Sequence, residues 1–321
     1  MKIAIVGATG AVGRELYNIL LSRSLFKNSI ISLFASKRSE GVKIYNNTVT
    51  EFHPEKINAD FTFFCSSSNF SKKWAPLLSY KTTIIDNTSA FRMNTNIPLI
   101  VPEVNSDMIG NRKIIANPNC TTAIAMMVLY PIYKKYGLKK IINSTYQAVS
   151  GAGKEGIDEL LEQTNIIGSE VKTKVFEHPI AYNVIPKIGD YYNNGYTTEE
   201  NKFINETQKI LNDDSIAISC TAVRVPTIRT HCESITVETE KELDSVEEII
   251  EYLKYQPMIS FNNLPMPDNA SNIDDVLYGR IRKNNLFGNN GLDMFIAGDQ
   301  IRRGAALNAV LIAEEIIGTR K

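Results

Sequence analysis

The opening segment constrains the fold of this chain more than any other. Residues 2–6 (KIAIV) form a short apolar run, and the glycine-rich string GATGAVG follows directly at residues 7–13. Apolar residues then recur at the spacing of one helix face, at Val12, Leu16, Ile19 and Leu20. An apolar strand, a glycine turn and an amphipathic helix form the first half of a βαβ unit. Similar short apolar runs occur at 30–35, 61–65, 83–86 and 113–116. We therefore predict a doubly wound parallel sheet.

The pattern changes after Cys120. A helix is predicted at 121–136, where Gly137 suits the left-handed cap that ends many helices. Longer alternating runs, typical of an antiparallel sheet with one solvated or helix-covered face, follow at 141–149, 216–225, 230–239, 276–282 and 294–297. Further helices are expected at 153–164, 198–211, 245–253 and 304–317. The prediction is α/β, with a first domain at 1–120 completed by a C-terminal helix at 301–321, and an α+β domain with a mostly antiparallel sheet at 121–300.

Size and charge exclude several classes of protein. The 321 residues exceed the roughly 150 usual for one domain, and the 35 Lys and Arg residues balance 35 Asp and Glu residues. No net field therefore attracts the chain to nucleic acid or to a membrane surface. The sequence has neither a secretion-type leader nor the ~20 consecutive apolar residues of a membrane helix. Its four cysteines lack the close spacing of a disulfide scaffold or zinc site. We expect a cytoplasmic protein without a bound metal.

The glycine turn has the form G-x-x-G-x-x-G, at Gly7, Gly10 and Gly13. A strand precedes it and a helix follows, so backbone N–H groups at the positive helix end are suited to a dinucleotide pyrophosphate. This favours a Rossmann-type nucleotide-binding domain. The competing interpretation is a tight turn in some other α/β protein.

The end of the second predicted strand distinguishes between two nucleotides. An NAD-binding unit usually carries an acidic residue about 20 positions after the glycines, to bind the ribose 2′-hydroxyl. Here residues 36–39 read SKRS. Two cations and two hydroxyls suit a 2′-phosphate, because arginine–phosphate hydrogen bonds are charge-assisted. We therefore predict NADP as the cofactor, against the alternative of a solvated basic loop.

Cys120 stands where an apolar strand gives way to a helix. The positive end of a helix stabilises a thiolate, and such positions lower a cysteine pKa from about 8.5 toward about 3.5 to 7.5. The thiolate is the effective nucleophile. Cys65, Cys220 and Cys232 lack this placement, and a buried, inert role is favoured for them. Cys120 is therefore the predicted nucleophile.

A thiolate that attacks a carbonyl needs a proton donor and acceptor, and histidine titrates near neutrality. The chain has three histidines. His53 and His178 each precede a proline, in segments that favour surface or structural roles. His231 begins a predicted strand among polar residues, shortly after the segment RVP at 224–226. We therefore select His231 as the acid/base.

Several longer strings resemble the aspartate-semialdehyde dehydrogenase family. They are VGATGAVG at 6–13, DNTSAFR at 86–92, VPEVN at 101–105, ANPNCTT at 116–122 and STYQAVSGAG at 144–153. NETQKI at 205–210, RVP at 224–226, HCES at 231–234 and GAA at 304–306 extend the likeness in the same order over essentially the whole chain. The resemblance implies an NADP-dependent homodimer that reduces L-aspartyl-4-phosphate to L-aspartate 4-semialdehyde in lysine, threonine, methionine and diaminopimelate biosynthesis.

The resemblance also implies roles for individual residues. Cys120 would carry an acyl thioester, His231 would relay the proton, and Gln147 would position the acyl group. Arg224 would bind the substrate α-carboxylate with its planar fork, and Glu199 would bind the α-ammonium. The phosphate pocket would be formed by Lys202, Arg92 and Asn119. The cofactor contacts would fall on Thr9, Gly10, Ala11, Val12, Ser36, Arg38, Ser39, Ser150, Gly151 and Gln300.

Three features depart from the family pattern. Cys232 stands where serine is expected, and Thr230 stands where glycine is usual beside the histidine. Strand alternation points Cys232 away from His231, so a second nucleophile is not expected. The stretch 64–70 differs from the family's small-residue loop near the cofactor.

Three alternative functions stay open. An N-acetyl-glutamyl-phosphate reductase would share the architecture and mechanism. The amine of its substrate is acetylated, however, and would need no anionic partner such as Glu199. A non-catalytic NADP-binding or redox-sensing homologue would not need Cys120, Gln147, Arg224 and His231 together. A cysteine hydrolase would have no use for the glycine turn.

Overall fold

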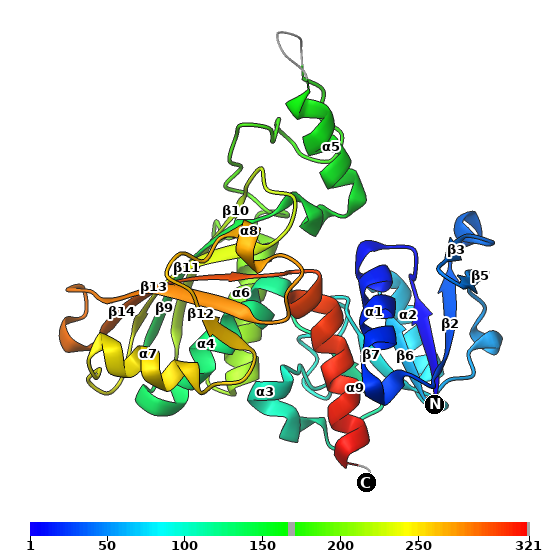
Figure 1. Cartoon of the computed structure of the whole chain (residues 1–321), viewed down its shortest axis with the longest axis horizontal. Helices are drawn as coiled ribbons and strands as arrows, with labels where there is room; N and C mark the ends of the chain where they lie inside the picture. The colour runs from blue at the N-terminus through cyan, green and yellow to red at the C-terminus, as the bar shows by residue number, and fades with distance from the viewer. Residues whose placement is uncertain (166–170, 320–321) are drawn as a thin grey trace. The chain divides into compact units, whose positions relative to one another are not determined.

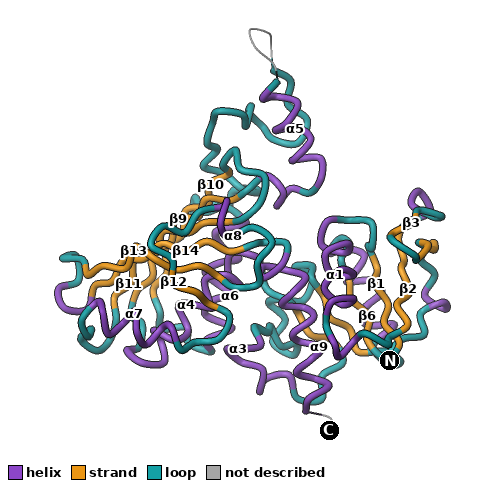
Figure 2. The backbone as a smooth tube through the Cα atoms, in the orientation of Figure 1, coloured by secondary structure: helices purple, strands orange, loops and turns teal. Residues whose placement is uncertain are grey.

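The structure, a computed structural model, describes residues 1–165 and 171–319. The chain divides into two compact units, Met1–Asn119 with Gly304–Lys321 and Cys120–Arg303 (Figure 1). Figure 2 shows a separate group of strands in each unit. Within the described ranges, no helix is both long and apolar enough to cross a membrane.

The first unit is built on a six-stranded sheet in the order β5-β2-β1-β6-β7-β8. Its strands are β1 Lys2–Val6, β2 Ile30–Ala35, β5 Thr50–Glu51, β6 Phe61–Phe64, β7 Thr83–Asp86 and β8 Ile114–Ala116. All its neighbouring strands pair in parallel, which confirms the doubly wound prediction. The strand order reverses between β1 and β6, so the glycine turn after β1 lies at the topological switch point where such sheets bind ligands.

Helices α1 Ala11–Ser22, α2 Ser68–Leu78, α3 Pro102–Asn105 and α9 Leu307–Thr319 complete this unit, with the small pair β3 Lys43–Ile44 and β4 Asn47–Thr48. The final helix packs against α1 and α3. It was predicted at 304–317, but a π-helical turn at Arg302–Ala306 precedes it. The Asn308 side chain donates to the Ile100 carbonyl at 2.9 Å and to Asn117 Oδ1 at 2.6 Å. Residues 320–321 of the predicted C-terminal segment lie outside the described residues.

The second unit contains a six-stranded sheet in the order β10-β9-β11-β14-β13-β12. The strands are β9 Lys140–Gln147, β10 Ala217–Arg224, β11 His231–Glu238, β12 Ile259–Phe261, β13 Val276–Lys283 and β14 Gly291–Gly298. The four strands β9, β11, β14 and β13 are antiparallel, as predicted. The edge strands β10 and β12 pair in parallel, so the sheet is mixed. The connection from β9 to β10 is a long helical crossover, which returns the chain in the same direction.

The helices of this unit are α4 Cys120–Tyr136, α5 Lys154–Thr164, α6 Thr198–Leu211, α7 Val246–Lys254 and α8 Pro267–Ala270. Helix α6 packs on β10 and α4, and α4 also contacts the central strands. Along β9 the odd-numbered residues are buried, whereas Ile142 and Tyr146 on the other face are 43% and 39% exposed. Along β9, one face of the sheet is therefore buried and the other is exposed. Nearer β13 and β14, Ala270 of α8 packs on that second face against Cys232 and Ala297.

Candidate active site

The sulfur of Cys120 belongs to the first residue of α4, a helix of 17 residues. It is half-buried, and none of the four cysteines forms a disulfide. Burial raises the pKa of the other three thiols, to about 12 for Cys65 and Cys232 and further for Cys220. Those three groups stay protonated near neutrality. Only Cys120 stands at the positive end of a long helix, which stabilises negative charge on sulfur.

Arg224 ends β10 and is only 7% exposed. Its Nη1 donates to the Ala148 carbonyl at 2.7 Å, and its guanidinium lies 5.9 Å from the centre of the Phe176 ring. Burial lowers the pKa of Arg224, while the negative charges of Glu199 and Cys120 raise it. The cation is therefore within electrostatic range of both groups, as a carboxylate-binding residue beside the nucleophile would be.

His231 is the first residue of β11 and has no solvent exposure. Its Nδ1 accepts a hydrogen bond from the Ala148 backbone N–H at 3.1 Å, and its Nε2 has no partner among the described residues. Burial, reinforced by the charge of Arg224, lowers the pKa of His231 to about 3. The ring is therefore neutral at pH 7, and because Nδ1 accepts, the proton resides on Nε2.

Gly151 lies beside both of these side chains. A Cβ at this position would be 2.8 Å from Arg224 Nη1 and 3.5 Å from His231 Nε2. Gln147, the last residue of β9, pairs in register with Arg224 and is buried. Its Nε2 donates to Thr145 Oγ1 at 3.3 Å. A larger residue at 151 would therefore displace the end of the Arg224 side chain.

Helix α6 supplies Glu199 and Lys202, which form an ion pair at 2.9 Å. The helix begins with a capping box between Thr197 and Glu200. Glu200 also accepts from the Ala222 backbone N–H at 2.9 Å and so ties α6 to β10. Glu200 is engaged in holding the helix in place, whereas Glu199 is within electrostatic range of Arg224.

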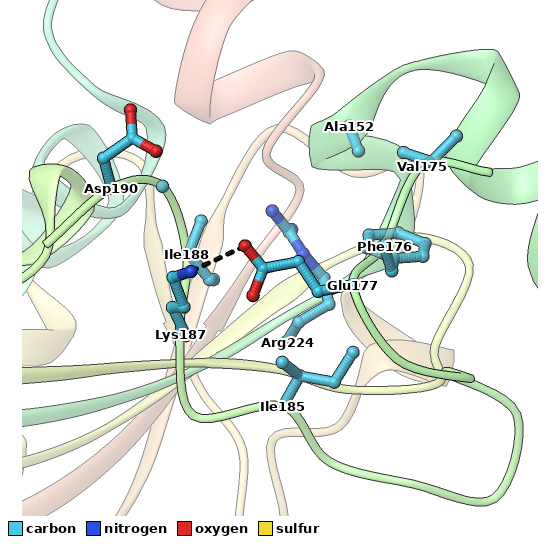
Figure 3. A pocket seen from close by; sticks show the side chains of 10 residues that line it. Ala152, Val175, Phe176, Glu177, Ile185, Lys187, Ile188, Asp190 and Arg224 are labelled. Atoms are coloured by element: carbon cyan, nitrogen blue, oxygen red, sulfur yellow. Dashed lines mark hydrogen bonds and ion pairs between the residues drawn. The ribbon is translucent and has the colours of Figure 1, made fainter. Parts of the chain in front are cut away.

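A cavity of about 260 Å³ adjoins Arg224 (Figure 3). Phe176, Ile185 and the ion pair of Lys187 with Glu177, 2.6 Å long, line its wall. Sequence reasoning did not identify these residues, because they lie in a segment without helix or strand periodicity. This segment therefore forms part of the wall of the cavity beside Arg224.

In the first unit, the glycine turn borders a second cavity, of about 430 Å³. Gly7 has φ +88°, and a Cβ there would be 2.3 Å from the Cys65 carbonyl oxygen. Gly10 is different, since its added Cβ would meet only one atom, at 3.5 Å, and leaves room for a ligand close to the backbone. The cavity lies at the carboxyl ends of β1, β2 and β6, where doubly wound sheets bind nucleotides.

Only some of the predicted cofactor-binding residues line this cavity. Thr9, Gly10 and Ser36 line it, together with Lys37, Glu51, Phe52 and Phe70, of which the last three were not predicted. Arg38 is exposed in the turn that follows, and Ser39 Oγ is 3.4 Å from Thr9 Oγ1. Ala11 and Val12 begin α1. Phe52 and Phe70 could not be identified from the sequence, because their spacing indicates only that they pack in a core.

The remaining predicted residues fall in both units. Arg92 is buried in the first unit, where its Nε donates to the Asn117 carbonyl at 2.9 Å and its Nη2 to the Asn87 carbonyl at 3.0 Å. Asn119 is buried and precedes Cys120 in the chain. In the second unit, Gln300 Nε2 donates to Ser150 Oγ, and Gln300 Oε1 accepts from the backbone N–H of residue 230 at 2.7 Å.

The chain is similar to known proteins over nearly its whole length. Residues 2–112 match the family model of the semialdehyde dehydrogenase NAD-binding domain, and residues 129–303 match the semialdehyde dehydrogenase dimerisation domain. The aspartate-semialdehyde dehydrogenase of Aquifex aeolicus is 43% identical, over 98% of each chain. That of Bacillus subtilis is 40% identical, over 98% of this chain and 97% of the relative.

Solved structures agree with these relatives. The crystal structure of aspartate semialdehyde dehydrogenase II from Vibrio cholerae, complexed with ASA, has a TM-score of 0.93 and is 40% identical, with 98% of each chain covered. A more distant structure from Candida albicans, with NADP, has the same fold at a TM-score of 0.78 and 24% identity. The family models, the full-length relatives and the fold lead to one conclusion: the chain belongs to the aspartate-semialdehyde dehydrogenase family.

Proposed function

We propose that this chain catalyses the reversible, NADPH-dependent reductive dephosphorylation of L-aspartyl-4-phosphate to L-aspartate 4-semialdehyde. The observation that supports this most directly is the grouping of the Cys120 sulfur with Arg224 and Glu199. The substrate carries a carboxylate, an ammonium and a phosphate. Arg224 complements the carboxylate, Glu199 the ammonium, and Lys202 the phosphate, with Arg92 and Asn119 as further phosphate ligands.

Cys120 acts as the nucleophile in this proposal. Its thiolate attacks the acyl carbon of aspartyl phosphate, a carbon–sulfur bond forms, and the carbon–oxygen bond to phosphate breaks with release of inorganic phosphate. A bound NADPH would supply the hydride that converts this thioester to the aldehyde, which frees the Cys120 thiolate. In the opposite direction, phosphate would cleave the thioester.

His231 acts on the oxygen of the reacting carbonyl. Because Ala148 N–H occupies Nδ1, the neutral ring offers its Nε2–H, and a hydrogen bond from it stabilises negative charge that develops on that oxygen. The sequence predicted that His231 also relays a proton as an acid/base, and that role stays a prediction. Gln147 positions the acyl group beside Arg224, its partner in the strand register.

NADP is the proposed cofactor. Gly10 leaves open space beside the start of α1, which fits a pyrophosphate approaching the backbone. Thr9, Ala11 and Val12 extend this cradle. Ser36, Arg38 and Ser39 would hold the 2′-phosphate, and Ser150, Gly151 and Gln300 would contact the nicotinamide end. Glu51 lines the same cavity as Lys37, so the cations must outweigh one nearby carboxylate.

We further propose a homodimer. The open face of the second sheet exposes Ile142 and Tyr146, and the ring of Tyr146 lies 6.0 Å from that of Phe295. An apolar sheet face of this kind is stable when it is covered by a partner. The match of residues 129–303 to a dimerisation domain supports the same assembly. Light scattering tests it, and a monomer at micromolar concentration would contradict it. The cytoplasmic location stays a prediction from the sequence.

The proposed reaction is tested with aspartate semialdehyde, phosphate and NADP, by following the formation of NADPH through its absorbance. Cys120→Ala removes activity, whereas Cys220→Ala, which removes a buried thiol on β10, keeps it. Normal turnover by the Cys120→Ala protein would exclude the thioester. Preferential turnover of N-acetyl-glutamyl phosphate would instead favour the alternative reductase, because the acetylated amine of that substrate does not need Glu199.

A further inference from the structure

The residue before His231 has an unusual backbone. Thr230 has φ +78° and no solvent exposure. A positive φ is rare for any residue with a Cβ and is a true outlier for a β-branched one, so the surrounding structure must impose it. Such strain is concentrated at functional sites, and here it lies in the residue that directly precedes His231.

Two hydrogen bonds hold Thr230 in this conformation. Ser271 Oγ–H donates to the Pro267 carbonyl at 2.7 Å, so its single proton is committed. The 2.8 Å contact between the Ser271 and Thr230 hydroxyls is therefore donated by Thr230. The Thr230 backbone N–H donates to Gln300 Oε1 at 2.7 Å. Both polar groups of this turn are thus directed to fixed acceptors.

The preceding residue is anchored to the same segment. Arg229 Nε donates to Asp299 Oδ2 at 2.6 Å, and the Asn272 backbone N–H donates to the same oxygen at 2.7 Å. Asp299 is fully buried. Residues 271–272 therefore hold residues 229–230 through a serine hydroxyl and a shared carboxylate.

The backbone angle at Thr230 sets the direction in which β11 begins. With φ at +78°, His231 Nδ1 meets the Ala148 N–H at 3.1 Å and Nε2 approaches Gly151. A return of Thr230 to negative φ would rotate the chain entering His231 and break this contact. We propose that Ser271 is a positioning residue, whose hydroxyl holds Thr230 in the left-handed conformation and thereby aims the His231 imidazole at the reacting carbonyl.

This inference rests on the proposed function. It is tested by removing the Ser271 hydroxyl from a protein with threonine at position 230 and from a protein with glycine there. Ser271→Ala in the full-length protein lowers kcat about tenfold, which corresponds to about 1.4 kcal/mol, while KM for aspartate semialdehyde changes less than about twofold. Thr230→Val, which keeps the branch but loses the hydroxyl, has the same effect. Thr230→Ser keeps the hydroxyl and retains kcat.

The decisive variant is Thr230→Gly, because glycine adopts positive φ without an anchoring bond. In that background Ser271→Ala changes kcat by less than about twofold, a rescue that general destabilisation would not produce. Ser260→Ala, which removes a hydroxyl bonded to Asp275, is the matched control and leaves kcat unchanged. Melting temperatures are measured for every variant.

Two results would overturn the inference. One is a wild-type kcat in Ser271→Ala, and the other is an equal loss with threonine and with glycine at position 230, which would show that Ser271 acts by another route. If Ser271→Ala does not fold, Thr230→Val alone must show the loss in kcat, and a normal rate there refutes the proposal. A wild-type protein that does not turn over aspartate semialdehyde would refute the proposed function itself, and this inference with it.

Discussion

Glu233 makes the stability of this protein depend on pH in a direction opposite to that of most carboxylates. It lies on β11 with no solvent exposure, and its Oε2 accepts from Asn143 Nδ2 at 2.6 Å. Its other oxygen and Asn143 Oδ1 have no partner among the described residues. Burial raises the pKa of Glu233 from 4.5 to about 8, and the Asn143 bond offsets only part of that. The carboxyl is therefore protonated at pH 7.

The sign and size follow from proton linkage. The unfolded chain releases this proton above pH 4.5, whereas the folded chain keeps it up to about pH 8. Below pH 4.5 the protonated Glu233 makes its full contribution to the free energy of unfolding, and this contribution is lost as the pH rises through the folded pKa. Between pH 5 and pH 8 the free energy of unfolding falls by about 1.4 kcal/mol per pH unit, or about 4 kcal/mol in all.

Glu233→Gln removes this titration, because the amide keeps the shape and is neutral at every pH. Urea unfolding at fixed protein concentration, from pH 5 to pH 9, should show the variant gaining about 4 kcal/mol relative to wild type by pH 8. The exposed Glu242→Gln serves as the control and should follow the wild-type curve. Parallel curves for wild type and Glu233→Gln would refute the buried, protonated carboxyl.

Three further variants test the site. Gly151→Ala places a methyl group 2.8 Å from Arg224 Nη1, so KM for aspartate semialdehyde should rise about tenfold in steady-state kinetics, and an unchanged KM would contradict the close approach. Arg224→Lys loses the two-point fork and should lower kcat/KM about 10- to 100-fold, while wild-type kinetics would show that another group binds the carboxylate. Replacing Lys37 and Arg38 with glutamine should raise the Kd for NADP about tenfold or more and barely change that for NAD, as measured by fluorescence titration; equal losses would count against a 2′-phosphate site.

The fold was predictable where local pattern and burial agree. The runs 30–35 and 83–86 and the helix at 198–211 were predicted with the bounds that the structure gives. Helix α2 was missed because its sequence SNFSKKWAPLL mixes polar and apolar residues and contains Pro76. It forms where Phe70, Trp74, Ala75 and Leu78 pack on the core of the first unit. Alternation also could not reveal that β10 is parallel to β9, since it reports which face is buried and not the strand direction.

The site was predictable in part for a similar reason. Cys120 could be selected because the strand and the helix that define its position are adjacent in sequence. The proximity of Arg224, His231 and Gly151 is a tertiary result, produced by Ala148, whose carbonyl binds Arg224 and whose N–H binds His231. No spacing rule connects residues 148, 224 and 231. The strings shared with the family supplied what local pattern could not.

The charges around Cys120 indicate how its thiolate is stabilised. The neutral state of His231 leaves no imidazolium to form an ion pair with the sulfur near pH 7, since burial and Arg224 lower the pKa of His231 to about 3. In our proposal the thiolate is stabilised by the positive helix end and by the Arg224 guanidinium, which is within electrostatic range of Cys120. The pH dependence of Cys120 alkylation by iodoacetamide, measured between pH 5 and pH 8, should therefore be the same in His231→Gln as in wild type. The alkylation rate itself should fall in Arg224→Gln. If His231→Gln altered the pH dependence of alkylation and Arg224→Gln did not change the rate, the thiolate would instead be stabilised by a His231 imidazolium.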